Sequence, residues 1–274
     1  MNRDKKLCEA KHTRYRALVG SLGWLAQSTR MDIAVAYACL ASYQDCPSPG
    51  HYEAALHVLR YLAGTADLGI SFKNTESVTL SGFVAWPKAQ EEGSTIYSDA
   101  NWGPQDASHP NPDSPRLMHM DECRSCLGYI IQRSNGPIAW GCTKESRTSR
   151  SSCESEIKAT DEAVKYMQFL RHVMSDMGLP ECQLPTPLWN DNSGAVTWSQ
   201  SVFHKLMRHF NIRNSAVRES IRFKEISIGH IEGKINPSDL LTKEQRDPKH
   251  FSDLRDSMLT PPPPQMRLRA ARAA

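Results

Sequence analysis

The spacing of the apolar residues changes once along the chain, near residue 68, and this change restricts the folds that the chain can adopt. Before it, three segments carry apolar residues three and four positions apart, the pattern of amphipathic helices. These segments are 15–27, 32–43 and 51–62. After it the apolar residues fall in short extended runs, which predict strands at 68–72, 78–86 and 94–102. We therefore expect a small helical unit followed by a sheet.

The remainder of the chain predicts that this sheet has mixed strand directions. Residues 125–142 contain two apolar runs on either side of Asn135-Gly136, a dipeptide typical of tight hairpin turns. A long helix is expected at 151–177, and helices and strands alternate after it. They are strand 184–192, a short helix, helix 207–224, strand 224–231 and a last helical stretch near Pro237. A hairpin followed by such alternation indicates an α/β fold, a mixed sheet covered by helices.

Two further segments are not expected to join the sheet. Four prolines between residues 103 and 124 exclude regular structure there and indicate a surface insertion. The tail 260–274 has no pattern that could bury a surface, and we expect it to be disordered. The predicted division is therefore a helical segment at 1–66, an α/β domain at 67–259 that includes the insertion, and the tail.

The composition indicates a folded protein outside the membrane. Hydrophobic residues make up 39% of the chain and charged residues 23%, enough apolar material for a core. No run approaches the roughly 18 apolar residues of a membrane span, and the first ten residues do not resemble a secretory signal. We expect a soluble intracellular protein whose eight cysteines are reduced. Only Cys123 and Cys126 are spaced as zinc ligands, without a second pair, so a structural zinc site is not expected.

Four acidic residues fall where open sheets place active sites, at strand ends and helix starts. They are Asp99, Glu156, Asp191 and Asp239. Four carboxylates at one sheet edge repel one another unless cations lie between them. Such a group is therefore either paired with basic residues or suited to hard divalent cations, which prefer oxygen ligands. Two magnesium ions about 3.5–4 Å apart would hold the attacking and leaving oxygens of a phosphoryl displacement.

Each acid also has a local explanation. Asp99 could be a turn residue, Asp191 could cap the helix that follows it, and Asp239 could favour a helix dipole. Glu154 fits a capping box with Ser151, in which its side chain reaches back to the Ser151 backbone. Glu156 has no such local role, and it is therefore the better candidate for a ligand.

The order of the acids and the residues around them carry a resemblance. The matching stretches are YSDANW, RSCLGYIIQRSNGPIAWGCTK, SRSSCESEIKAT, LWNDNSGAV, FHKLMRHFNIR and SDLLTK. In this order they resemble the ribonuclease H region of copia-type LTR retrotransposon polyproteins. Residues 15–70 are similar to the segment that connects the reverse transcriptase palm to that region, so the resemblance covers roughly 15–250.

The resemblance implies a ribonuclease H-like fold and an activity. By it, the four acids would be catalytic metal ligands, with two Mg²⁺ or Mn²⁺ ions as cofactors. The substrate would be an RNA–DNA hybrid whose RNA strand is cut, leaving a 3′ hydroxyl and a 5′ phosphate. The rest of a retroelement polyprotein would be a partner. The protein would reside in cytoplasmic particles or in the nucleus.

Basic residues gather in one segment that could bind the hybrid. Residues 203–224 hold six basic residues and one acid, a local net charge of +5 in a chain whose total is +3. A hybrid is recognised mainly through its backbone and shape, so we expect five of them to contact it. These five are Lys205, Arg208, Arg213, Arg218 and Arg222. The alternative is a solvated polar helix face opposite Phe210, Val217 and Ile221.

Some features depart from the family pattern and leave a second function open. The chain has no Asp-Asp pair, so polymerisation by it is not expected. The insertion at 103–124 is long, and Asn211 stands where the family usually has an acid. The alternative is thus an inactive or co-opted retroelement remnant that binds nucleic acid or protein. A transposase or integrase shares the fold but normally has its glutamate last, whereas here the glutamate comes second.

Overall fold

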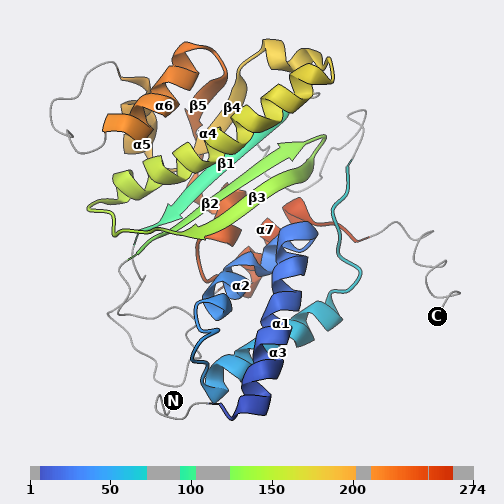
Figure 1. The fold of residues 1–274 in the computed structure, drawn as a ribbon. Helices are drawn as coiled ribbons and strands as arrows, with labels where there is room; N and C mark the ends of the chain where they lie inside the picture. The colour runs from blue at the N-terminus through green and yellow to red at the C-terminus, as the bar shows by residue number, and fades with distance from the viewer. Residues whose placement is uncertain (1–6, 73–92, 103–123, 202–210, 246, 262–274) are drawn as a thin grey trace, which may run out of the picture.

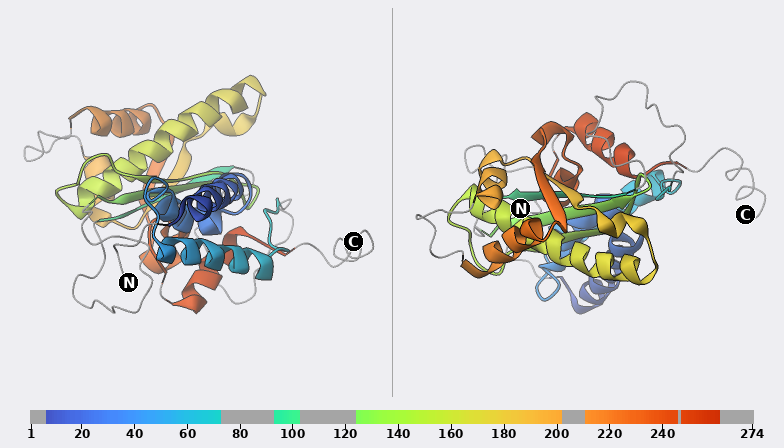
Figure 2. Two further views of the ribbon diagram at one scale, coloured as in Figure 1. Left: turned by 60° about the horizontal axis from the view of Figure 1, so that its bottom comes forward. Right: turned by 90° about the horizontal axis from the view of Figure 1, so that it is seen from above.

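A five-stranded mixed sheet lies at the centre of the molecule, with helices on both of its faces (Figures 1 and 2). The computed structural model describes residues 7–72, 93–102, 124–201, 211–245 and 247–261. The strands are β1 (Ser94–Asn101), β2 (Cys126–Arg133), β3 (Gly136–Lys144), β4 (Thr186–Asn190) and β5 (Ile226–His230). They lie in the order β3-β2-β1-β4-β5. β1, β2 and β3 pair antiparallel, whereas β4 pairs parallel with β1 and with β5, which confirms the predicted mixed sheet.

The hairpin between β2 and β3 turns one residue earlier than predicted. Ser134 and Asn135 form the two-residue loop, with positive φ angles of 52° and 59°. Gly136 is the first residue of β3, and it is needed there for a different reason. A Cβ at Gly136 would lie 2.7 Å from the carbonyl oxygen of Ser71 and 2.6 Å from the ring of Phe72. The glycine therefore permits a close approach of residues 71 and 72.

The three predicted helices of the first quarter are present and share one core. They are α1 (Glu9–Ser28), α2 (Ala34–Ala41) and α3 (Pro49–Gly64). Tyr15, Leu22 and Leu40 are buried between them. The start of α3 lies two residues before the predicted one, because Ser48 caps it and Pro49 occupies the first turn. The expected helical segment is thereby confirmed.

This helical segment packs against one face of the sheet. Trp140 of β3 donates a 2.7 Å hydrogen bond from Nε1 to the carbonyl oxygen of Ala26 in α1. Met31 belongs to the same buried cluster as Tyr97 of β1 and Ile130 of β2. The 3₁₀ segment η5 (Pro237–Leu241) and α7 (Pro248–Met258) cover the same face.

The other face of the sheet is covered by α4 (Ser152–Asp176), with α5 (Ser193–Gln200) and α6 (Asn211–Arg222) beside it (Figure 1). Val164 and Met167 of α4 pack on Ile96 of β1 and Leu188 of β4. The helix predicted at 151–177 extends one residue too far, because α4 ends at Asp176 and Met177 beyond it is 69% exposed.

Several predictions fall partly or wholly outside the described residues. These are the strand at 78–86, the insertion at 103–124 except its last residue, and the tail from 262 onward. Residues 68–72 make only an isolated bridge between Gly69 and Thr260 rather than the predicted strand. The division at residues 66 and 259 stays a prediction. None of the described helices has both the length and the apolar character needed to cross a membrane.

Candidate active site

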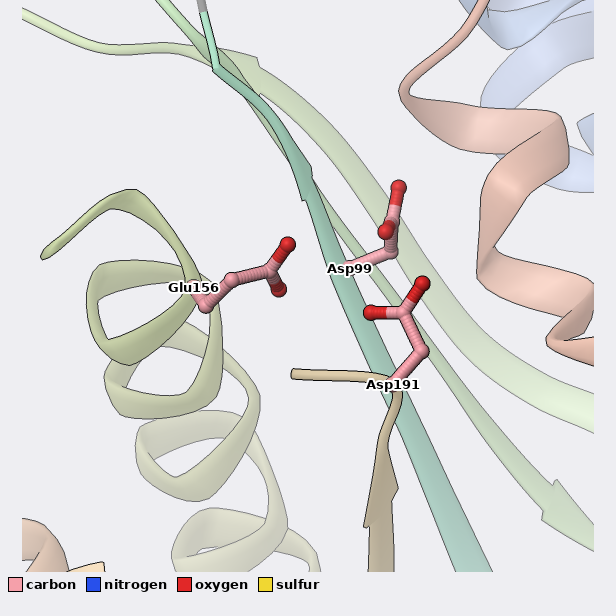
Figure 3. Close-up of side chains that lie close together, drawn as sticks. All are labelled: Asp99, Glu156 and Asp191. Atoms are coloured by element: carbon pink, nitrogen blue, oxygen red, sulfur yellow. The ribbon is translucent and has the colours of Figure 1, made fainter. Parts of the chain in front are cut away.

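Three of the four predicted acids meet at one end of the central strands. The register of β1 and β4 pairs Ser98 with Asn190, so the residues that follow them lie side by side. Those residues are Asp99 and Asp191, and α4 brings Glu156 to them from one face of the sheet (Figure 3). One carboxylate oxygen from each acid lies within 4.8 Å of the other two. Among the described residues, these three acids form the group of three or more Asp, Glu, His or Cys side chains that lie close enough together to hold one cation.

The start of α4 separates the roles of its two glutamates. Ser151 caps the helix, because its Oγ accepts a 3.2 Å hydrogen bond from the backbone N–H of Glu154. The capping box predicted that the Glu154 carboxylate accepts a hydrogen bond from the backbone of Ser151. It accepts a 2.7 Å bond from the N–H of Arg150 instead. Glu154 therefore has a local role, and Glu156, which is buried, is the one that faces the other acids.

The local explanations for Asp99 and Asp191 are wrong. Asp99 is a fully buried residue of β1, not a turn residue. The helix after Asp191 is capped by Asn192, whose Oδ1 accepts a 3.0 Å bond from the N–H of Ala195. Neither aspartate is therefore explained by a turn or a cap.

Asn190 orients Glu156, and the sequence reasoning missed it. Its Nδ2 donates to Glu156 Oε2 at 3.0 Å and to Ser98 Oγ at 3.1 Å. Its Oδ1 accepts a 2.9 Å bond from the N–H of Asn192. The signal available was the polar residue at the end of the strand, because side chains there alternate between the two faces of the sheet and this one points to the face that α4 covers.

The fourth acid, Asp239, reaches the site through a lysine. It lies in η5, and its Oδ1 accepts a 2.6 Å bond from Lys243 Nζ. The same ammonium donates to Asp99 Oδ1 at 3.1 Å, while Thr242 Oγ1 donates to Asp99 Oδ2. Asp239 is therefore not part of the group of three, and Lys243 was not predicted, although it ends the SDLLTK stretch.

Burial and mutual repulsion shift the proton affinities of these groups. Burial first, then the charges of Asp99 and Asp191, raise the pKa of Glu156 well above its usual value. Burial and Asp99 also raise the pKa of Asp191. The pKa of Asp239 rises to about 7, mainly through burial and Asp99, against the opposing effect of Lys243. Burial alone would lower the pKa of Lys243, but the neighbouring carboxylates raise it.

These residues fit a divalent cation of the hard type. The donors are carboxylate oxygens from Asp99, Glu156 and Asp191, which Mg²⁺ and Mn²⁺ prefer. Burial first, and then the neighbouring carboxylates, raise the pKa of Glu156 and of Asp191, so the ionised form of each is disfavoured at this place. A bound cation would relieve that repulsion.

The predicted nucleic-acid contacts are only partly described. Lys205 and Arg208 lie outside the described residues, and of Arg213 only the backbone, in α6, is described. The guanidinium of Arg218 stacks on the ring of Trp198, 3.6 Å from the ring centroid. Nη2 of Arg218 also donates a 3.0 Å hydrogen bond to the backbone carbonyl oxygen of Trp198. Arg222 is exposed. A role for these residues in binding nucleic acid stays a prediction.

Comparisons with known proteins point to retrotransposons. No protein-family model matches the chain. It is 29% identical over 232 residues to a Retrovirus-related Pol polyprotein from transposon RE2 of Arabidopsis thaliana, a match that covers 84% of this chain and 14% of that protein. It is 26% identical over 230 residues to the corresponding polyprotein from transposon TNT 1-94 of Nicotiana tabacum. This chain thus spans about one seventh of the length of these polyproteins.

Other matches are to a shorter protein and to solved structures. The Secreted RxLR effector protein 161 of Plasmopara viticola is 29% identical over 155 residues, which cover 57% of this chain and 89% of the effector. Among solved structures, LC11-RNase H1 in complex with an RNA/DNA hybrid aligns with 54% of this chain and 93% of its own, at 13% identity and a TM-score of 0.37. RNase H1 from the archaeon Halobacterium salinarum aligns with the same shares, at 14% identity and a TM-score of 0.37.

The resemblance that the sequence motifs indicated is confirmed by the relatives. Transposon Pol polyproteins match 84% of the chain. This chain is similar to a part of the Pol polyproteins of retrotransposons, as the sequence motifs predicted.

Proposed function

We propose that the chain is a metal-dependent endonuclease that cuts the RNA strand of RNA–DNA hybrids. The observation that carries this proposal is the meeting of Asp99, Glu156 and Asp191 at one end of the central strands. Three buried or half-buried carboxylates with oxygens within 4.8 Å of one another are unfavourable without a cation. Their similarity in order to the acids of the ribonuclease H family supports a hydrolytic role for the cation.

The side chains of the chain have separate roles in this proposal. Asp99, Glu156 and Asp191 would hold Mg²⁺ or Mn²⁺, and Asp99 and Asp239 would be the ligands of a second such ion. Bound cations of this kind supply activation of a water and stabilisation of the charge on the transferred phosphate. Asn190 keeps Glu156 aimed at the site through its 3.0 Å hydrogen bond, so that the ligand does not turn away.

The hybrid itself would be bound mainly through its phosphates. We propose Lys205, Arg208, Arg213 and Arg222 as contacts to the backbone, because they belong to the segment with a local net charge of +5. Arg218 differs from these four because two of its donors are directed to the carbonyl oxygen of Trp198. Its loss should therefore weaken the packing of α6 on α5 as well as any phosphate contact.

The proposal is tested by cleavage of a labelled RNA–DNA hybrid in Mg²⁺. The parental chain should cut the RNA strand, and Asp99→Asn and Asp191→Asn should not, because each loses a charged ligand oxygen. Both variants should still unfold cooperatively, because asparagine has nearly the shape of aspartate and can keep hydrogen bonds at the buried Asp99 and at Asp191, which follows β4. Cleavage at the parental rate by both variants would contradict the proposal.

Asp176→Asn is the matched control. Asp176 is an exposed aspartate at the last residue of α4, twenty residues and about 30 Å along the helix from Glu156. It loses the same charge without touching the site, so its cleavage rate should equal the parental one. Double-stranded DNA and single-stranded RNA serve as substrate controls, since neither should be cut at the rate of the hybrid.

A second candidate function is binding without turnover. The similarity to the Plasmopara viticola effector favours this second function. The match covers 89% of the effector, so a similar sequence exists outside the polyproteins. The chain would then be a co-opted remnant that binds nucleic acid or protein. The same assay separates the two functions, because a hybrid that is retained but left uncut in Mg²⁺ favours the second.

A further inference from the structure

Lys243 lies inside the carboxylate site as a cation of the chain itself. Its Nζ donates to Asp239 Oδ1 at 2.6 Å and to Asp99 Oδ1 at 3.1 Å. The side chain of Lys243 is 20% exposed, and those of Asp99 and Asp239 are 0% and 10% exposed. The ammonium thus bridges two acids that have little other access to solvent.

Asp239 lies outside the group of three acids and is joined to it through this lysine. Asp99, Glu156 and Asp191 have ligand oxygens within 4.8 Å of one another, and Asp239 does not belong to that group. Asp99 is shared between the two arrangements, because it contacts Lys243 and also lies near Glu156 and Asp191. A divalent ion between Asp99 and Asp239 would meet the ammonium of Lys243 there.

Only the side chain of Lys243 would have to move to release these acids. Its backbone N–H donates to the carbonyl oxygen of Asp239 at 3.2 Å, which fixes the backbone to the end of η5. Thr242 holds Asp99 through a separate hydrogen bond. The four-carbon stem of a lysine can rotate while these contacts remain.

We propose that Lys243 takes the place of one divalent ion on Asp99 and Asp239, so that the free chain binds one such ion strongly and a second only after Lys243 has left. The first ion is held by Asp99, Glu156 and Asp191. The second competes with the ammonium for the two aspartates. Lys243 is therefore a positioning residue that sets the number of ions bound at a given concentration.

The number of ions is measured by calorimetry or by the electron paramagnetic resonance of free Mn²⁺, on the full chain without nucleic acid. The parental chain should bind one Mn²⁺ strongly and a second at least about tenfold more weakly. Lys243→Met keeps most of the stem but removes the charge, and it should bring the second affinity up by about tenfold or more. Equal affinities for both ions in the parental chain, no Mn²⁺ binding, or no change in the variant would overturn the proposal.

Lys165→Met is the matched control. Lys165 also lies between two carboxylates, 2.8 Å from Asp161 and 3.1 Å from Glu162, but nine residues along α4 from Glu156. Its loss should leave the Mn²⁺ isotherm unchanged. Lys243→Arg keeps a cation at the site and should retain the preference for one ion.

A second measurement uses the parental chain and does not depend on how the variants fold. An acylating reagent modifies free lysine amines, and mass spectrometry gives the rate at each lysine. Lys243 should react slowly at Mn²⁺ concentrations that fill the first site and faster at those that fill the second. A rate at Lys243 that does not change while the second ion binds would contradict the proposal.

The inference rests on the proposed function only for the type of ion, and the two can fail separately. If the Mn²⁺ stoichiometry follows the expectation but the hybrid is not cut, the proposed nuclease is wrong and the role of Lys243 stands. If the hybrid is cut in Mg²⁺ but Lys243→Met binds ions like the parental chain, the nuclease stands and the role of Lys243 is wrong.

Discussion

Replacing Gly128 by alanine should disturb both the fold and the acid cluster, because this residue lies where the sheet contacts η5 and the residue that follows it. Gly128 of β2 pairs with Asp99 of β1. A Cβ at residue 128 would lie 2.5 Å from Thr242 Cγ2 and 3.0 Å from Leu241 Cβ. Carbon atoms in good contact are about 3.5–4.0 Å apart, so the two layers must separate by about 1 Å.

The cost follows from the lack of room around this contact. Thr242 and Leu241 are both fully buried, and neither can turn into solvent to make space. Inserting one carbon into a packed core costs about 1–3 kcal/mol, and we expect Gly128→Ala to lower the free energy of unfolding by that amount. Thr242 would carry the displacement to Asp99, to which it donates a hydrogen bond, so the affinity for Mn²⁺ should fall as well.

Urea unfolding measures the effect, with Gly20→Ala as its control. Gly20 lies within α1, and no atom is within 4 Å of the position that its Cβ would take. Alanine favours helix over glycine, so this control should be more stable by about 0.5–1 kcal/mol. The reasoning is refuted if Gly128→Ala has the parental free energy of unfolding and the parental Mn²⁺ affinity.

Three other measurements follow from the structure. Trp140→Phe removes the donor to the carbonyl oxygen of Ala26 and should lower the free energy of urea unfolding by about 0.5–1.5 kcal/mol, whereas an unchanged value would mean that water replaces this bond. Cys39 should resist alkylation at pH 8 until the chain unfolds, because burial raises its pKa to about 12, while the exposed Cys46 reacts in the folded chain; equal rates would contradict this. In EDTA the thermal unfolding midpoint should decrease as the pH is raised from 4 to 8. Folding raises the pKa of Asp239 from 3.8 to about 7, so in this range the folded chain binds a proton that the unfolded chain has released, and the stability from that proton is lost as the pH rises through about 7. Asp239→Asn should flatten this decline, and an equal slope in both proteins would exclude Asp239 as its source.

The part of the site that could be predicted from the sequence is the part that strand register determines. Asp99 lies near the carboxyl end of β1 and Asp191 directly follows the neighbouring parallel strand β4, so a sheet that pairs these strands in this register brings them together. Glu156 was distinguished from Glu154 by the capping pattern at Ser151, which is local. These three acids therefore meet as their positions in the predicted elements indicate.

The parts that could not be predicted depend on side-chain contacts across long sequence separations. Lys243 contacts Asp99 over 144 positions, and no local pattern distinguishes this lysine from a solvated one. Arg218 belongs to a basic segment by sequence, yet its guanidinium stacks on Trp198, twenty positions away. Whether an arginine contacts phosphate or packs on the protein depends on whether its side chain points to solvent or to a neighbouring helix. A count of charges along the segment does not contain that information.

The segment from Asn236 to Lys243 explains how the acids can stay together in the absence of a bound ion. Asn236 donates to the carbonyl oxygen of Ser98 at 3.0 Å, so the segment is fixed to β1 one residue before Asp99. Thr242 and Lys243 then donate to both carboxylate oxygens of that aspartate. The contacts that join this segment to the sheet are therefore also the contacts that offset the repulsion among the acids. Since a divalent ion that displaces Lys243 would remove one of these contacts, the second ion should loosen the segment that the first ion leaves in place.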